Sequence, residues 1–164
     1  MNLIAVIRRL SLKEILSLIV LLVQYPLYIF PTLRATKQTL NICNIEYKDS
    51  HHLHGKGNAF RHALWNVLLA LYTFRIHKNV QKSIKWAERI TDLHEELAPN
   101  NSLEKAMDLH NNAVGRAFFG GLKNHTLNEI VVEVKQRAEC GIVIRTILDI
   151  EQYKKDLVYL AEEN

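Results

Sequence analysis

Proline, glycine and cysteine are scarce in this 164-residue chain, which has three prolines, six glycines and two cysteines. Because proline and glycine interrupt helices, their scarcity favours a helix-rich fold. Cys43 and Cys140 are too few and too far apart in sequence for a disulfide framework, and no C-x-x-C motif indicates a zinc site. The chain also lacks the motifs H-E-x-x-H and G-x-S-x-G, and neither cysteine has a convincing motif neighbour. These absences disfavour the familiar zinc-protease, serine-nucleophile and cysteine-nucleophile classes.

The composition is that of an ordinary globular domain with a mildly basic charge. Hydrophobic residues make up 48% of the chain and charged residues 23%, with a formal net charge of +4 at pH 7. The length suits one domain that can bury a sizeable core. A positive net charge suits an anionic partner such as phospholipid. The basic residues form no stripe interleaved with aromatic ones, so nucleic acid is not an expected partner.

The apolar periodicity predicts an all-α, single-domain bundle of several helices with a central buried helix and an apolar N-terminal helix. The central helix is expected from Ala59 to His77, because apolar residues occupy a wide arc of it. We divide the chain into an apolar N-terminal arm, residues 1–34, and a helical domain, residues 35–164, which carries the polar site. A polar loop is predicted over residues 46–58, and a second helix over 80–98. A third helix is predicted from Ser102 to a stop at Gly120–Gly121. A capping box at Thr126 opens a further helix, and the C-terminal segment is predicted to be helical or partly extended.

The N-terminal arm is the least ordinary part of the sequence. The run "ILSLIVLLVQYPLYIFPTL", residues 15–33, carries no charge, and Arg8, Arg9 and Lys13 precede it. A capping box of Ser11 and Glu14 predicts a helix that starts near residue 12 and ends or kinks at the proline at position 26. That leaves roughly 14 regular residues, fewer than the roughly 20 that cross a bilayer.

Three interpretations of this arm stay open. It can lie on a membrane lipid surface through residues 1–33, pack as a hydrophobic arm onto the domain core, or form a true span or signal anchor. No small-residue cleavage site follows the apolar run, so a cleavable signal peptide is the least favoured. We therefore expect a cytoplasmic protein or one peripheral to the inner membrane, with a membrane-anchored form as the alternative.

Polar side chains recur on three of the predicted helices. On the central helix, Asn58, His62 and Asn66 are spaced by four and line up as one stripe. On the next helix the apolar stripe Trp86, Ile90, Leu93 and Leu97 places His94 at its edge and Glu95 nearly opposite, so His94 is predicted to point inward more readily than Glu95.

The third helix carries "MDLHNNAVGR", residues 107–116, which is rich in short polar groups that are mediocre helix formers. His110 and Asn111 project inward, and Arg116 projects outward. Gly115 is expected to let another backbone or a ligand come close, because a glycine inside a helix costs up to about 1 kcal/mol. Buried polar groups need partners, so this stretch predicts a site rather than plain core.

Histidines and carboxylates that project from facing helices are how helical bundles build metal centres. We therefore predict a hydrolase site, with a divalent metal such as zinc, manganese or iron, that acts on a phosphodiester, a lipid or another anionic substrate. The predicted metal ligands are His62, His94 and Asp108; the predicted catalytic residues are His62, Glu95, Asp108 and His110; and the predicted binding or positioning residues are Asn58, Arg61, Trp65, Asn66, Asn111, Asn112 and Arg116.

Two alternatives remain beside the metal hypothesis. In a metal-free site, Glu95 and Asp108 would act as an acid and base pair on a glycan, or Asp108 would orient His62 as a general base. In the other alternative the protein is a non-catalytic membrane-surface binding or structural protein, and the polar network only fixes helix packing.

Three blocks, "NAFRHALWN", "WAERITDLHEE" and "MDLHNNAVGR", resemble those of a bacterial domain family of unknown function. The family occurs as short stand-alone proteins, notably in Bacteroidota, and as the C-terminal module of large secreted toxin-like proteins. The resemblance spans about residues 58–116 and implies a small helical domain that is an enzyme when delivered as a toxin. It implies functional roles at Asn58, Arg61, His62, Trp65, His94, Glu95, Asp108, Asn111, Asn112 and Arg116.

Overall fold

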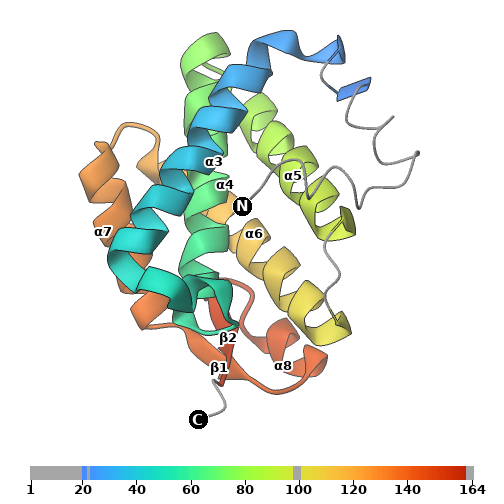
Figure 1. The fold of residues 1–164 in the computed structure, drawn as a ribbon, viewed down its shortest axis with the longest axis vertical. Coiled ribbons are helices and arrows are strands. Elements are labelled where there is room, and N and C mark those ends of the chain that lie inside the picture. Colours follow the sequence, from blue (N-terminus) through green and yellow to red (C-terminus); the bar gives the residue numbers. More distant parts are fainter. Residues whose placement is uncertain (1–19, 22, 98–100, 162–164) are drawn as a thin grey trace.

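The computed structural model describes residues 20–21, 23–97 and 101–161, and these residues form a helical bundle with one very small sheet (Figure 1). The predicted all-α fold is confirmed. In chain order the elements are α3 (Pro26–Tyr47), a 3-10 turn (Lys48–His52), α4 (Lys56–His77), α5 (Val80–Leu97), α6 (Ser102–Leu122), α7 (Leu127–Glu139), β1 (Ile142–Ile144), α8 (Ile147–Gln152) and β2 (Val158–Leu160).

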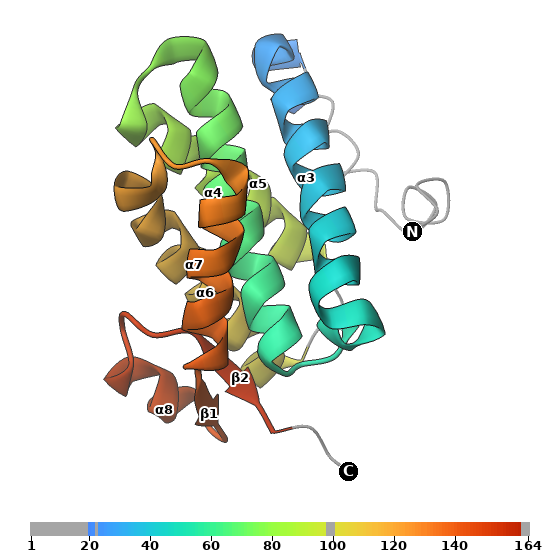
Figure 2. The ribbon, with the colours of Figure 1, turned by 90° about the vertical axis from the view of Figure 1, so that its left-hand side faces the viewer.

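Helix α4 is the centre of the bundle. It packs against α3, α5, α6 and α7, and Figures 1 and 2 show it enclosed by these helices. Phe60, Leu64, Val67 and Leu68 on this helix are fully buried. The predicted central helix is therefore confirmed, although it begins at Lys56, inside the segment that the sequence predicts as a loop.

The N-terminal prediction is only partly covered by the described residues. Most of the helix predicted to begin near residue 12 lies outside them. Tyr25 separates helical residues 23–24 from α3, and Pro26 stands in the first turn of α3. This is the interruption that the proline predicts. Helix α3 itself, which the sequence did not predict, runs without a break across the expected boundary between residues 34 and 35.

The two predicted ends of α6 have different outcomes. The helix begins at Ser102 as predicted, but its cap is Asn101 and not Ser102, the candidate cap in the sequence; the Asn101 side chain accepts from the backbone of residues 103 and 104 while Glu104 completes the capping box. Helix α6 also runs through Gly120 and Gly121 to Leu122. Neither glycine takes a positive φ, so neither forms the left-handed cap that makes glycine a stop signal. The capping box at Thr126 is confirmed.

The C-terminal segment closes the lower end of the bundle in Figure 1. Strands β1 and β2 pair in parallel with Ile142 opposite Val158, and α8 lies between them in sequence. Asn111 on α6 secures β2, because its amide donates to the Val158 carbonyl at 2.8 Å and accepts from the Val158 N–H at 2.9 Å. Asn111 therefore pairs with the edge of the strand as another strand would.

Among the described residues, no helix combines the length and the apolar character needed to cross a membrane.

Candidate functional site

Three ionisable side chains from three helices meet inside the bundle. His62 comes from α4, Glu95 from α5 and Asp108 from α6, and their side chains are 1–3% exposed. The Oε1 atom of Glu95 lies 3.5 Å from Nδ1 of His62, and the Oδ1 atom of Asp108 lies 3.3 Å from Nε2 of the same ring. We call His62, Glu95 and Asp108 the buried triad.

The position of Glu95 overturns the predicted rotation of α5. The face of α5 that packs into the bundle carries a column of small and polar residues at four-residue spacing: Ser83, Ala87, Thr91 and Glu95, each at most 1% exposed. The apolar stripe of the same helix instead lines a groove beside α3. The prediction took the most apolar face as the inward one, and it therefore turned His94 toward the site and Glu95 away from it.

His62 is held in one tautomer by its neighbours. The Nη2 of Arg61 lies 3.0 Å from Nε2 of His62. A guanidinium nitrogen can only donate, so Nε2 accepts and the ring proton lies on Nδ1. From there it donates to Oδ1 of Asn112 at 3.1 Å. Burial and the charge of Arg61 hold the pKa of His62 well below its usual value, so the ring is neutral at pH 7.

Asn112 connects the triad to a wider amide network. Its Nδ2 donates to Oε1 of Glu95 at 2.9 Å, and its Oδ1 accepts from Nδ2 of Asn66 at 2.7 Å as well as from His62. The Oδ1 of Asn66 accepts from Oγ1 of Thr91 and from Nη1 of Arg116, each at 3.3 Å. Arg116 thus reaches inward although its helical projection predicts an outward direction.

Thr91 is the member of this network that the sequence reasoning missed. It is fully buried, and besides Asn66 it donates to the carbonyl of Ala87 at 3.0 Å. The signal was present in the sequence, because Ala87, Thr91 and Glu95 are spaced by four and share a helix face.

Glu95 is an unusual group to find in such a place. Burial raises its pKa, while the amide of Asn112 and the charge of Arg61 oppose this shift. Its second oxygen, Oε2, is buried and has no hydrogen-bond partner among the described residues. An unsatisfied buried carboxylate oxygen is costly, so it is an indication of a ligand or ion at this position.

The remaining predicted residues lie around the triad or away from it. Asn58 donates to the Leu53 carbonyl at 2.9 Å and so fixes the turn before α4. Trp65 donates to Thr36 at 3.0 Å and ties α4 to α3. His110 is bonded to the Asp156 carbonyl at 2.9 Å, in the C-terminal segment. None of these three bonds involves a member of the triad.

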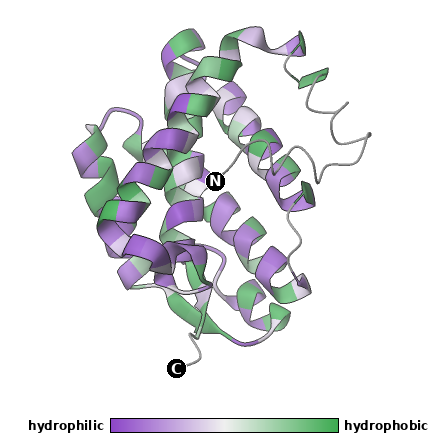
Figure 3. Cartoon of the chain, in the orientation of Figure 1, coloured by the Kyte–Doolittle hydropathy of each residue, from purple (hydrophilic) through white to green (hydrophobic). Residues whose placement is uncertain are grey.

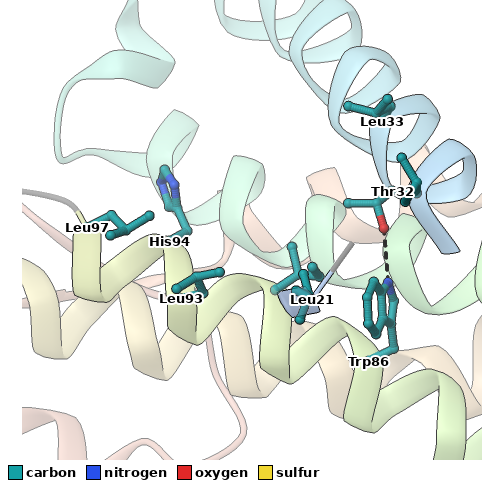
Figure 4. Close-up of a pocket in the computed structure, with 9 residues that line it drawn as sticks. Leu21, Thr32, Leu33, Trp86, Leu93, His94 and Leu97 are labelled. Carbon is teal, nitrogen blue, oxygen red and sulfur yellow. Dashed lines mark hydrogen bonds between the residues drawn. The ribbon is translucent and has the colours of Figure 1, made fainter. Parts of the chain in front are cut away.

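His94 belongs to a different surface. Its ring meets the Trp65 ring edge-on, with the centroids 5.1 Å apart, and it lines an apolar pocket of about 260 Å³ between α3 and α5. Figure 4 shows this pocket, with Leu93, Leu97 and Trp86 from α5 facing Leu33 of α3. Of the three predicted ligands, His62 and Asp108 therefore lie together with Glu95, and His94 lies outside this group.

The triad has the donor set of a metal site. One ligand atom from each of His62, Glu95 and Asp108 lies within 4.8 Å of the other two. One imidazole and two carboxylates suit zinc, manganese or iron, as the sequence predicts. The geometry also allows the metal-free alternative, in which the two carboxylates flank the imidazole and move its protons.

The comparisons with known proteins bear on the family alone. No curated protein and no solved structure matches the chain. A family model described as "Domain of unknown function (DUF6973)" matches residues 19–142. The predicted membership of an uncharacterised family is confirmed, while its occurrence in Bacteroidota and in toxin-like proteins stays a prediction. Because the match extends over more than half of the chain, the protein belongs to this family, a domain of unknown function.

Proposed function

We propose that the protein is a hydrolase in which the buried triad holds one divalent metal ion and acts on an anionic substrate such as a phosphodiester or a lipid. The observation that carries the proposal is the convergence of one imidazole and two carboxylates from three different helices, all buried. A divalent ion there would lower the pKa of a bound water toward 7 and polarise a phosphoryl or carbonyl oxygen.

Two features of the triad support an ion. Nε2 of His62 and Oδ1 of Asp108 face each other at 3.3 Å, and both are acceptors when the ring proton is on Nδ1. Two acceptors so close repel each other unless a positive charge lies beside them, and in this structure the Arg61 guanidinium, which donates to Nε2 and lies near Asp108, provides that charge, so the position already stabilises a cation. The unpaired Oε2 of Glu95 offers a further ligand atom in the same site.

An ion must displace a contact that His62 makes in this structure. At Nε2 it competes with Arg61, and at Nδ1 it competes with Asn112. Displacing Arg61 from Nε2 would leave part of its bonding intact, because its Nη1 is also bonded to the His51 carbonyl at the turn before α4. A released Nη2 would then be a donor for an anionic group of the substrate.

We expect the untagged protein, purified without added metal or chelator, to carry about one zinc, manganese or iron ion per chain by mass spectrometry. His62→Ala and Asp108→Asn should each lose that ion, since each removes one of three ligands. The matched control is His94→Ala. It removes the histidine that precedes Glu95 in sequence but lies outside the triad, so this variant protein should retain the ion. A wild-type protein without stoichiometric metal would reject the metal site, as would retention of the ion in both triad variants.

The burial of the site favours a second candidate function, a non-catalytic protein whose polar network fixes the packing of α4, α5 and α6. His62, Glu95 and Asp108 are too buried to meet a substrate unless the helices move. This alternative predicts that Asp108→Asn lowers the free energy of unfolding by about 1–3 kcal/mol, with no metal lost. The metal hypothesis predicts instead that a chelator lowers the melting temperature of the wild type, that added zinc or manganese restores it, and that neither treatment changes that variant.

A further inference from the structure

Helix α3 carries a row of exposed apolar side chains on its outer face. Val23, just before the helix, is 75% exposed, and Leu27, Phe30 and Leu33 are 73%, 72% and 62% exposed. Leu27, Phe30 and Leu33 follow one another at spacings of three within α3, so they lie on one side of the helix, and Val23 stands just before the break at Tyr25. Single exposed apolar residues are ordinary, whereas three on one helix face, with a fourth next to it in sequence, indicate an interaction surface.

Basic residues continue and flank this row. Arg34 and Lys37 are exposed at the next spacings along the same face of α3, and no acidic residue occurs in α3 before Glu46. On the adjacent helix α5, Lys82, Lys85 and Arg89 are also exposed. Figure 3 shows the change in character along α3, whose N-terminal part is mostly apolar and whose C-terminal part is more polar.

Aromatic side chains lie between the apolar row and the α5 lysines. Tyr28 meets Trp86 edge-on with centroids 4.8 Å apart, and Tyr25 lies 5.2 Å from the same ring. Arg89 stands over the Tyr25 ring at 5.0 Å. These residues, with Lys82 and Lys85, line a pocket of about 420 Å³. Tyrosine and tryptophan favour the membrane–water interface, where an apolar ring and a polar tip are both satisfied.

We propose that the outer face of α3, with the basic edge of α5, docks onto a bilayer that contains anionic phospholipid. The apolar row would enter the acyl boundary, and the cations of Arg34, Lys37, Lys82, Lys85 and Arg89 would meet the phosphate groups. Charge complementarity favours this partner, since Arg34 and Lys37 continue the apolar row and three cations lie on the adjacent stretch of α5, where Glu88 is the one exposed acidic residue among the described residues 80–89. Residues 1–19 are also mostly apolar, and they carry Arg8, Arg9 and Lys13 beside one acidic residue, Glu14.

This surface shares no residue with the buried triad. A protein that does not bind the bilayer would therefore leave the proposed hydrolase function untouched. In the same way, a protein that holds no metal could still bind the bilayer.

The test uses the full chain and flotation with vesicles of phosphatidylcholine alone or mixed with phosphatidylglycerol. The wild type should bind the mixed vesicles. Leu27→Ser combined with Phe30→Ser should weaken that binding about tenfold or more, because two large apolar groups no longer enter the bilayer. The matched control is Val132→Ser with Leu148→Ser, which are 65% and 69% exposed on other faces and should bind as the wild type does.

The charge contribution is tested separately. Lys82→Glu with Lys85→Glu should weaken binding to the mixed vesicles roughly tenfold or more at low salt, and the difference should shrink as salt rises. The control pair Lys154→Glu with Lys155→Glu makes the same charge change at two exposed positions near the C-terminal strand and should have a much smaller effect.

Two outcomes would overturn the proposal. In the first, both variant pairs on the docking face bind mixed vesicles as well as the wild type does. In the second, the Leu27 and Phe30 changes leave vesicle binding intact. They instead lower the melting temperature of the protein or halve its mass as measured by light scattering. The face would then be covered by another part of this chain or by a second copy.

Discussion

Replacement of Asn112 by leucine is expected to lower the free energy of unfolding by about 4 kcal/mol, because several buried polar groups lose a hydrogen-bond partner at once. The Asn112 amide accepts from Nδ1 of His62 and from Asn66, and it donates to Oε1 of Glu95. Leucine has a similar size and a better helix propensity, so the loss comes from the hydrogen bonds and not from the shape. Urea unfolding of both proteins measures the difference.

The control is Asn128→Leu, the same substitution at an exposed position of α7. It should change the free energy of unfolding by no more than about 0.5 kcal/mol. If Asn112→Leu is equally mild, the network contributes little to stability, and the packing alternative for the buried triad loses its support. The apolar variant also removes a bond that orients Glu95, so metal content should be measured on the same sample.

The residue types that gather in the site could be predicted from the sequence, but its geometry could not. The four-residue spacing of Asn58, His62 and Asn66 placed three polar groups on one face of a buried helix, and all three are buried in the structure. For α5 the same reasoning failed, because it ranked faces by apolar content. The face of α5 that enters the bundle is made of small and polar residues, which let the helices approach closely.

The fold shows a similar division. Capping boxes and long apolar faces are local signals, and they located α4, α5 and α7 within a few residues. Helix α3 was not predicted, because Pro26 was interpreted as the end or kink of the N-terminal helix and not as the start of a new one. Pro26 sits in the first turn, where a missing N–H costs nothing. The parallel pair β1 and β2 depends on Asn111 of α6, a contact 47 residues away in sequence that no local pattern reveals.

The close approach of α4 and α6 leads to the second large expected effect. A Cβ added at Gly115 would lie 2.6 Å from both Cα and the carbonyl oxygen of Ala63. Both atoms belong to the backbone of a helix that is packed on four sides, so neither can give way by a rotamer change. Gly115→Ala is therefore expected to lower the free energy of unfolding by about 3 kcal/mol, as measured by urea unfolding. A loss of that size would confirm that α6 needs glycine at position 115 to approach the α4 backbone at Ala63.

Gly120→Ala provides the matched control, because it makes the same substitution five residues further along the same helix. No atom lies within 4 Å of the Cβ that it would add, and its backbone is helical. Alanine there should raise stability by about 0.5–1 kcal/mol, since only the helix preference of the two residues differs. The two variants must therefore differ in sign. If Gly115→Ala is also stabilising, α4 and α6 are further apart than in this structure. The contacts of Asp108 and Asn112 with His62, and with them the buried triad, would then be wrong.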